Sequence, residues 1–392
     1  MKITAVEGVI LRYEMPYRLT YARGEYATRE AMLVKVHTDE PGLVGWGEAA
    51  MWGGPAVTSA TVIEQEIGPL VIGHDPRRPE FLWEKVYQET YYHGRKGMLL
   101  ACLSGVDIAL WDIVGKCANQ PLWRLFGGFG KPVIAYASSG YYRSEYGPDD
   151  LARDIVKATE AGYRGYKMKV GNIPQVVHAG VLEHVPLRDS IEKDFARIRV
   201  AREALGPGGD LMCDANASLD LSVALRYAVE LERVEARWFE EPLQPENVEG
   251  CTELARRTRV PIAGFETETG KYQFARLMDA GAIQVVQPDV IQVGGLTEAR
   301  KIAQYAQIKH LCFTAKNYST AISAAACLQL LYAIPNGDYF ECDQDPLPWR
   351  EGILAEPAYV IEDGMVRPSE RPGLGAQIDE KRLQSWRVTL KS

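Results

Sequence analysis

Cysteine is scarce in this chain, and its thiols form no recognisable motif. The 392 residues include seven cysteines, an odd number, and no Cys-x-x-Cys pair. This spacing excludes a zinc knuckle and argues against a disulfide framework, so we expect reduced thiols. Cys213, Cys312 and Cys342 lie in apolar runs and are predicted to be buried packing residues.

Long basic runs and long apolar runs are missing as well. The formal net charge is -8, and without a basic stripe the chain has no electrostatic footprint for nucleic acid or for an anionic membrane. We find no apolar stretch that approaches the length of a membrane span, and residues 1–10 lack the apolar block of a signal peptide. We therefore expect a cytoplasmic protein that acts on small molecules.

The length of the chain predicts two domains. A chain of 392 residues exceeds the size at which a single core usually stops growing, and its hydrophobic share of 46% is ordinary for a globular protein. Residues 1–130 read as strands followed by helices, which predicts an α+β domain. Within it, residues 99–118 are apolar over most of the helix surface and predict a buried helix that joins the two domains.

Short apolar runs alternate with segments of helical length from residue 131 to residue 345. Eight runs are predicted strands: 133–138, 165–170, 210–215, 236–241, 261–266, 283–289, 311–316 and 339–342. This alternation is typical of an α/β fold, the parallel (β/α) barrel, whose strand ends all meet at one face. Residues 172–190 are interpreted as an insertion, a lid or an interface, and residues 346–392 are predicted to fold back over the first domain.

Three acidic residues end three consecutive predicted strands. Asp214, Glu240 and Glu266 are each 26 residues apart, so one carboxylate arrives per strand-helix unit. Neighbouring strands end side by side, so we expect the carboxylates to converge on a site for Mg²⁺, or Mn²⁺. Helix capping is the alternative for any one of them. Glu268 would replace Glu266 if the strand register were shifted, and Asn216 either binds substrate, orients a ligand or forms a turn.

The segment GYKMKV places two lysines on one face of a strand. Lys167 and Lys169 are two residues apart, so both point into the barrel if the intervening apolar residues face the helices. A second ammonium and a metal cation would lower the pKa of each buried lysine and make a neutral amine accessible near pH 7. We therefore predict that Lys169 removes a proton α to a carboxylate, because a divalent cation stabilises the resulting enediolate. A solvated edge strand is the alternative.

Polar residues also end the last three predicted strands. Asp289, Lys316 and Glu341 follow Glu266 at intervals of 23, 27 and 25 residues. Lys316 is a candidate acid or electrostatic clamp with Asp289 as its partner, and Glu341 would donate a hydrogen bond to the developing oxyanion if it stays protonated. A helix cap or a salt bridge inside the barrel is the alternative for each.

Six ordered motifs resemble one known family. They span nearly the whole chain and are GYKMKVG, MCDAN, WFEEP, AGFET, QPDVIQVGG and RPGLG. Together they resemble the enolase superfamily, in its mandelate racemase and muconate-lactonising branch. The resemblance implies a modified TIM-type barrel under an N-terminal capping domain, with Mg²⁺ bound by Asp214, Glu240 and Glu266 and with Lys169 as the base beside Lys167.

The resemblance also suggests how substrate is selected and where the chain departs from its family. Capping-domain loops near residues 17–26 and 51–55 would select substrate, which makes Tyr26 and Trp52 candidate substrate-binding residues, and the family suggests a homo-oligomer. Mandelate racemase-like members place a histidine at the end of strand seven, where this chain has Lys316. Muconate-lactonising members carry a second catalytic lysine on strand six, so Lys316 does not restore that pattern either.

Three functions remain open at this point. The leading hypothesis is dehydration of a sugar acid, an aldonate or aldarate, with Lys316 or Glu341 assisting departure of the β-hydroxyl. The second is a racemase, epimerase or cycloisomerase in which Lys169 and Lys316 work on opposite faces of the α-carbon. The third is a binding protein for sugar acids that has lost turnover.

Overall fold

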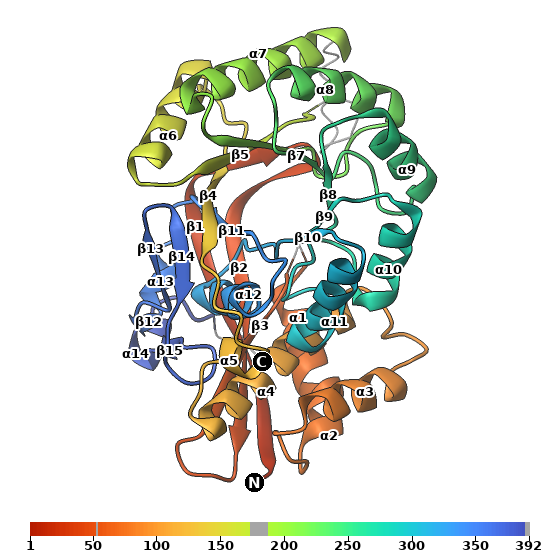
Figure 1. The fold of residues 1–392 in the computed structure, drawn as a ribbon. Coiled ribbons are helices and arrows are strands. Elements are labelled where there is room, and N and C mark those ends of the chain that lie inside the picture. Colours follow the sequence, from red (N-terminus) through yellow and green to blue (C-terminus); the bar gives the residue numbers. More distant parts are fainter. Residues whose placement is uncertain (52–53, 173–186, 389–392) are drawn as a thin grey trace.

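The chain opens with an antiparallel sheet that is covered by helices on one face. In the computed structural model, which describes residues 1–51, 54–172 and 187–388, β1 (Ile3–Tyr21), β2 (Gly24–Thr38) and β3 (Val44–Ala49) pair in that order (Figure 1). The helices that follow are α1 (Ala56–Thr61), the π-helix η1 (Val62–Ile67), α2 (Gly68–Val71), α3 (Pro79–Glu89), α4 (Met98–Ala118) and α5 (Leu122–Leu125). Alternate residues of β1 and β2 face these helices and form the core of this capping domain.

Eight parallel strands then form a barrel. They are β4 (Val133–Ser139), β5 (Gly165–Lys169), β6 (Asp210–Asp214), β7 (Trp238–Glu240), β8 (Ile262–Gly264), β9 (Val285–Val286), β10 (Cys312–Phe313) and β11 (Tyr339–Asp343). Strands β4 to β10 are neighbours in chain order and β11 pairs with β4, so the sheet closes on itself through a bridge between Phe313 and Gly337. The predicted fold class, a barrel under an N-terminal capping domain, is confirmed.

Helices on the outside of the barrel connect these strands (Figure 1). They are α6 (Pro148–Glu160), α7 (Leu187–Leu205), α8 (Leu221–Arg233), α9 (Val248–Arg257), α10 (Gly270–Ala280), α11 (Gly295–Ile308) and α12 (Ala321–Ala333). Side-chain caps start several of them, as where Asp220 accepts a hydrogen bond from the Val223 N–H and Asn247 accepts one from the Gly250 N–H. The capping residues Asp220 and Asn247 thus mark where α8 and α9 begin.

Several strands are shorter than predicted. β8, β9 and β10 end at Gly264, Val286 and Phe313, so Glu266, Asp289 and Lys316 lie in the loops beyond them. Single backbone hydrogen bonds continue beyond these ends, and Asp289 and Lys316 form one parallel bridge. The side chains of interest consequently sit above the barrel mouth as well as inside it.

Helix α4 corrects one expectation from the sequence. Its 21 residues, Met98–Ala118, are long and apolar enough by composition to cross a membrane, with a mean hydropathy of 1.7. The expectation that no apolar run approaches this length was therefore wrong. However, 83% of this apolar window is buried inside the protein, against β3 and α11. A helix that is apolar all round and packed on all sides is a core helix of a globular protein.

Buried carboxylates of the capping domain hold the barrel in place. Glu48 on β3 accepts hydrogen bonds from Thr320 Oγ1 (2.6 Å) and the Ser323 N–H (2.9 Å), at the start of α12. Asp107 on α4 accepts from Thr297 Oγ1 (2.6 Å) and the Thr297 N–H (2.9 Å), at the start of α11. A helix N-terminus presents unpaired N–H groups and favours an acidic partner. The two domains are therefore joined by specific polar contacts as well as by apolar packing.

The C-terminal segment contacts both domains. It contains α13 (Trp349–Gly352), β12 (Leu354–Glu356), β13 (Tyr359–Glu362), β14 (Met365–Pro368), β15 (Gln377–Ile378) and α14 (Glu380–Leu383). β14 pairs with β4 of the barrel, and the backbone of Val388 donates to the Ile10 carbonyl of β1. All seven cysteines are free thiols. Most of the insertion predicted at residues 172–190 lies outside the described residues.

Tight contact between β3 and α4 can be tested with one methyl group. A Cβ added at Gly47 would lie 1.9 Å from the Gly105 carbonyl oxygen of α4, so Gly47→Ala must push the sheet and the helix apart. We expect overpacking of this kind to lower the free energy of unfolding by about 3 kcal/mol in denaturant titrations. The control is Gly208→Ala, whose Cβ would meet no atom within 4 Å. Equal stability of the two variants would contradict the packing argument.

Candidate active site and metal centre

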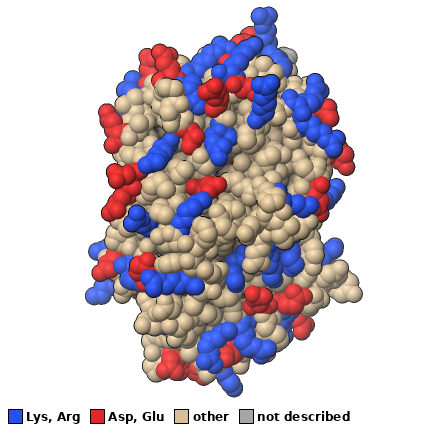
Figure 2. All heavy atoms as spheres, viewed as in Figure 1, with Lys and Arg blue, Asp and Glu red and all other residues tan. Residues whose placement is uncertain are grey.

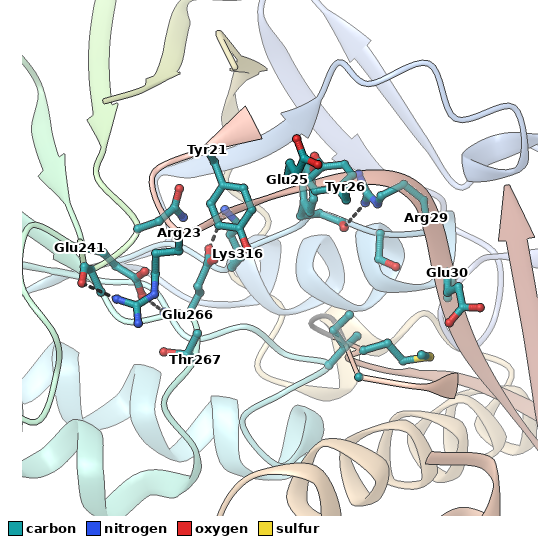
Figure 3. A pocket seen from close by; sticks show the side chains of 18 of the residues that line it. Tyr21, Arg23, Glu25, Tyr26, Arg29, Glu30, Glu241, Glu266, Thr267 and Lys316 are labelled. Carbon is teal, nitrogen blue, oxygen red and sulfur yellow. Dashed lines mark hydrogen bonds and ion pairs between the residues drawn. The ribbon is translucent and has the colours of Figure 1, made fainter. Parts of the chain in front are cut away.

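A cavity lies between the β1–β2 hairpin and the carboxyl ends of the barrel strands. Its volume is about 910 Å³, and its lining includes Lys169, Asn216, Glu266 and Lys316 from the barrel. Tyr26 and Arg23 are among the lining residues that the capping domain contributes. Figure 3 shows Arg23 reaching from the hairpin toward Glu241 and Glu266, and Arg23 Nη1 donates to the Ala217 carbonyl (2.8 Å). The cavity is therefore a joint product of both domains.

The three carboxylates predicted from equal spacing come together at the inner end of this cavity. Asp214 and Glu240 are the last residues of β6 and β7, and Glu266 follows β8. One oxygen from each residue lies within 4.8 Å of the others. Asp214 and Glu240 are buried, whereas the side chain of Glu266 keeps 15% of its surface exposed toward the cavity. The alternative ligand Glu268 is not part of this cluster.

Each carboxylate of the cluster lies against a different lysine. Lys169 Nζ is 2.5 Å from Asp214 Oδ2, Lys167 Nζ is 2.5 Å from Glu240 Oε1, and Lys316 Nζ is 2.6 Å from Glu266 Oε2. Such charge-assisted contacts offset the cost of burying the carboxylates. They also fix the orientation of each carboxylate relative to its lysine.

The donor set fits a divalent cation with hard ligands. Three carboxylates converge from three adjacent strand ends, and each carboxylate oxygen keeps a second lone pair beyond the one that a lysine uses. Other groups support the cluster from behind: Glu240 Oε2 accepts from Trp238 Nε1 (3.1 Å) and Gln287 Nε2 (3.2 Å), and Asp214 Oδ1 accepts from the Asn216 N–H (2.9 Å). Oxygen ligands of this kind suit Mg²⁺ or Mn²⁺.

The two lysines of β5 have different surroundings. Lys169 lines the cavity, 5.4 Å from the centre of the Tyr141 ring, whereas Lys167 is fully buried between Glu240 and Glu341. Burial lowers the pKa of Lys167, but those two carboxylates raise it more, so that its pKa lies above the usual value. The lowering expected from a second ammonium is thus outweighed at Lys167 by its two neighbouring carboxylates. Lys169 is the lysine of this pair that a substrate in the cavity can contact.

Lys316 has partners other than the one predicted. Its backbone forms a bridge with Asp289, but its ammonium contacts Glu266, with Glu341 at 3.4 Å and Glu240 at 3.7 Å. Asp289 Oδ1 instead accepts a hydrogen bond from the Ile291 N–H (2.9 Å), and burial raises the pKa of Asp289 well above its usual value. The expected Lys316–Asp289 pair is therefore corrected, and Lys316 belongs to the carboxylate cluster.

Glu341 also differs from its predicted state. Burial raises the pKa of Glu341, but the ammonium groups of Lys167 and Lys316 have the larger effect and lower this pKa to about 2. The carboxylate is therefore ionised, and the suggestion that a protonated Glu341 donates a hydrogen bond to the oxyanion is corrected. Its contact with Lys167 (2.8 Å) gives it a role in holding that lysine in place.

Several residues of the cavity were not identified from the sequence. Glu241 is buried beside the cluster, and one of its oxygens accepts the Glu266 N–H (2.8 Å). Tyr141 and Tyr318 form part of the wall. The doublet in WFEEP was a usable signal for Glu241, whereas Tyr141 and Tyr318 lie in loops whose paths no local pattern predicts. Trp52, predicted to bind substrate, lies outside the described residues.

Charges of both signs are mixed inside the cavity and on the surface. The cavity lining includes Arg12, Arg23 and Arg29, together with Glu14, Glu25, Glu30 and Glu246. On the outer face that Figure 2 shows, Lys and Arg alternate with Asp and Glu around the edge, and the middle is mostly uncharged. The lining is suited to a ligand with both acidic and hydroxyl groups.

Both domains match models of known families. Residues 6–127 match the mandelate racemase / muconate lactonizing enzyme N-terminal domain, and residues 150–382 match the enolase C-terminal domain-like family. D-galactarolactone cycloisomerase from Agrobacterium fabrum is 32% identical in an alignment of 398 positions that covers 99% of each chain. Arabinonate dehydratase from Saccharolobus solfataricus is 30% identical over 95% of this chain and 97% of its own.

Solved structures give the same result. A racemase from Streptomyces coelicolor with bound magnesium is 29% identical, with a TM-score of 0.86 over 98% of this chain and 100% of its own. A protein from Bordetella bronchiseptica complexed with 2-oxoglutarate/phosphate is 32% identical, with a TM-score of 0.87 over 100% of this chain and 99% of its own. Relatives thus bind a metal ion in one case and a small carboxylate in the other.

The carboxylate cluster predicts that a divalent cation stabilises the fold. Mg²⁺ at 100 times its Kd should raise the free energy of unfolding by roughly 2.7 kcal/mol, and Asp214→Asn should lose most of this response. The measurement is the melting temperature as a function of Mg²⁺ concentration. Asp210→Asn is the matched control, because Asp210 begins the same strand at the opposite end. A full Mg²⁺ response in Asp214→Asn would contradict the assignment.

Proposed function

Because the chain belongs to the mandelate racemase and muconate lactonizing enzyme family of the enolase superfamily, we propose that it dehydrates a sugar acid. The observation that carries this proposal is that Lys169 and Lys316 both line the cavity beside the three-carboxylate cluster. A base, an acid and a cation site are the groups that removal of an α-proton and a β-hydroxyl requires. The relatives named above are enzymes, one a dehydratase and one a cycloisomerase.

In this proposal the metal ion is Mg²⁺, held by Asp214, Glu240 and Glu266. When bound, the ion supplies positive charge that stabilises the enediolate. Lys167 stays paired with Glu240 and Glu341 and helps to hold the ligands. The ion bound in the Streptomyces coelicolor relative supports Mg²⁺ over Mn²⁺.

Lys169 removes the α-proton. The Cα–H bond breaks, and Lys169, acting as a neutral amine, accepts the proton on Nζ. The electron pair of the broken bond is delocalised into the carboxylate. The Cβ–O bond then breaks, and the hydroxyl group leaves as water with a proton from the Lys316 ammonium. Burial lowers the pKa of Lys316, but Glu266 and Glu341 raise it well above the usual value, so this side chain carries its proton as an ammonium. The resulting enol becomes a 2-keto-3-deoxy acid.

The lining of the cavity supports a polyhydroxylated substrate. Glutamates on its walls accept hydrogen bonds from hydroxyl groups, and arginines interact with carboxylate oxygens. An apolar or aromatic substrate would take these charged groups out of contact with water, at a cost in binding free energy. A sugar acid supplies a carboxylate for the metal site and hydroxyls for the walls.

A second candidate is a racemase, epimerase or cycloisomerase. Lys169 lies against Asp214 and Lys316 against Glu266, so the two amines contact different members of the cluster. In two-base chemistry one amine removes the α-proton and the other returns a proton to the opposite face of the same carbon. One relative is a cycloisomerase. A binding protein without turnover is less favoured, because the relatives named above are enzymes. We also propose that the protein works in the cytoplasm as a homo-oligomer.

The dehydration proposal predicts a keto acid product from a panel of aldonates and aldarates. With Mg²⁺, at least one member should yield a 2-keto-3-deoxy acid, detected by mass spectrometry, and Lys169→Met should lower kcat by at least about 10³-fold because it removes the base. Lys193→Met, at an exposed position of α7, is the control and should retain activity. Absence of product across the panel would contradict dehydration.

Lys316 separates the two candidate reactions. If Lys316 only protonates the departing hydroxyl, Lys316→Gln should abolish dehydration while deuterium from D₂O still enters the α-position through Lys169. If Lys316 is instead the second base of a racemase or epimerase, the inverted product should carry α-deuterium in the wild type and disappear in the variant. Proton NMR of the recovered acid distinguishes these outcomes, and normal dehydration by Lys316→Gln would contradict its role as acid.

A further inference from the structure

The turn of the β1–β2 hairpin places two hydrogen-bond donors over the cavity. Tyr21 ends β1, and Arg23 lies in the turn before Gly24 begins β2. Both side chains line the cavity, and Figure 3 shows them extending from the hairpin toward Glu266. Burial raises the pKa of Tyr21, Glu266 raises it further and Arg23 lowers it, so both charges act on this hydroxyl. The hairpin therefore brings a phenol and a guanidinium to the barrel mouth.

Arg23 is held in position by the barrel. Its Nη1 donates to the Ala217 carbonyl oxygen (2.8 Å), and the Ala217 N–H donates to the Glu241 carbonyl oxygen (2.7 Å). Ala217 follows β6, three residues beyond Asp214. The guanidinium is thus fixed next to the loop after β6, although the side chain as a whole stays exposed.

The positive charge of Arg23 has no carboxylate partner among the described residues. A guanidinium has five N–H groups, and the Ala217 carbonyl is the one polar contact that Arg23 makes within the described chain. The other cations of the cavity lining are ion-paired: Arg12 with Glu30, Arg29 with Asp345, Lys169 with Asp214 and Lys316 with Glu266. Arg23 is therefore the cation of the described lining whose remaining donors are available to an anionic ligand.

The Tyr21 hydroxyl is a second available donor. It has no hydrogen-bond partner among the described residues, and a phenol that keeps its hydrogen donates one hydrogen bond. A carboxylate has two acceptor oxygens, so it can accept from Tyr21 and from Arg23 at once. A neutral hydroxymethyl group in the same place would gain no charge-assisted contact. The pair is thus better suited to a carboxylate than to an uncharged group.

The carboxylate next to the reacting carbon has a different cation. In the proposed reaction it lies at Asp214, Glu240 and Glu266, where a divalent cation offsets its charge. No ion pair joins Arg23 to any of these three residues. The cavity of about 910 Å³ also has room for a chain of several carbons beyond the metal site. Arg23 and Tyr21 are therefore suited to a second anionic group on the same ligand.

We propose that Arg23 and Tyr21 form a subsite for the carboxylate at the end of the substrate that is remote from the reacting carbon. The preferred substrates are then aldarates, sugar acids with a carboxylate at each end, over aldonates, which have a hydroxymethyl group in that place. This inference rests on the proposed function, because it assumes a sugar acid whose first carboxylate lies at the metal site. It gives the turn of the hairpin a direct contact with the ligand.

The test compares each aldarate with the aldonate of the same configuration, such as galactarate with galactonate and glucarate with gluconate. With Mg²⁺, the wild type should have a higher kcat/KM for one aldarate than for its aldonate. Arg23→Gln should raise KM for that aldarate by about 10- to 100-fold, the range for a hydrogen bond to a charged group. The kcat for the aldarate and the KM for the aldonate should change little.

Further variants separate charge from folding. Arg23→Lys keeps the charge and should restore part of the lost affinity. Tyr21→Phe should raise KM for the same aldarate by at least about 3-fold, and it provides a second variant if Arg23→Gln folds poorly. Arg226→Gln is the matched control, because Arg226 is an exposed arginine on α8 that lies outside the cavity lining.

Isothermal titration calorimetry of the same acids with Mg²⁺ measures binding without turnover. Conversion of no sugar acid by the wild type would refute the proposed function, whereas a calorimetric preference for the aldarate that Arg23→Gln removes would still support the subsite. If Arg23→Gln weakens both acids of a pair equally, the guanidinium contacts the carboxylate that they share, and the remote subsite is refuted. Equal wild-type affinity for the two acids, or binding of neither, would refute it as well.

Discussion

Charge neutralisation at the barrel mouth is the constraint on which this structure depends. Asp214, Glu240 and Glu341 are buried, and carboxylates without partners would be too costly in such a place. The lysines that neutralise them come from β5 and from the loop after β10, on different sides of the ring. Closure of the barrel brings these segments together, so the buried carboxylates are neutralised when the barrel is formed.

The sequence predicted the fold and the centre of the site well because both follow regular rules. Equal spacing identified Asp214, Glu240 and Glu266 as candidates that the structure brings together, and alternation predicted the strands. The protonation states of side chains were not predictable, because they depend on neighbours in three dimensions. The raised pKa of Lys167 and the ionised Glu341 follow from contacts across the barrel, which no spacing along the chain discloses.

The least predictable part is the wall that the two domains share. Tyr318 and Asp345 lie in loops after strands, and neither stands in a periodic pattern. Both contact Arg29, which is 289 residues from Tyr318 in the chain. Long loops with irregular paths carry such contacts in many barrels, because loops vary while the barrel keeps its shape. The same property allows one fold to serve different substrates.

Helix α4 packs on the sheet of the capping domain and also contacts the barrel, where Asp107 and Ser104 meet the start of α11. Recombination between relatives therefore has a preferred boundary. A chimaera joined near residue 130 would combine an α4 from one parent with an α11 from the other, and their shared surface would not match. Exchange of only the β1–β2 hairpin, which contributes residues to the cavity wall, would leave that surface intact.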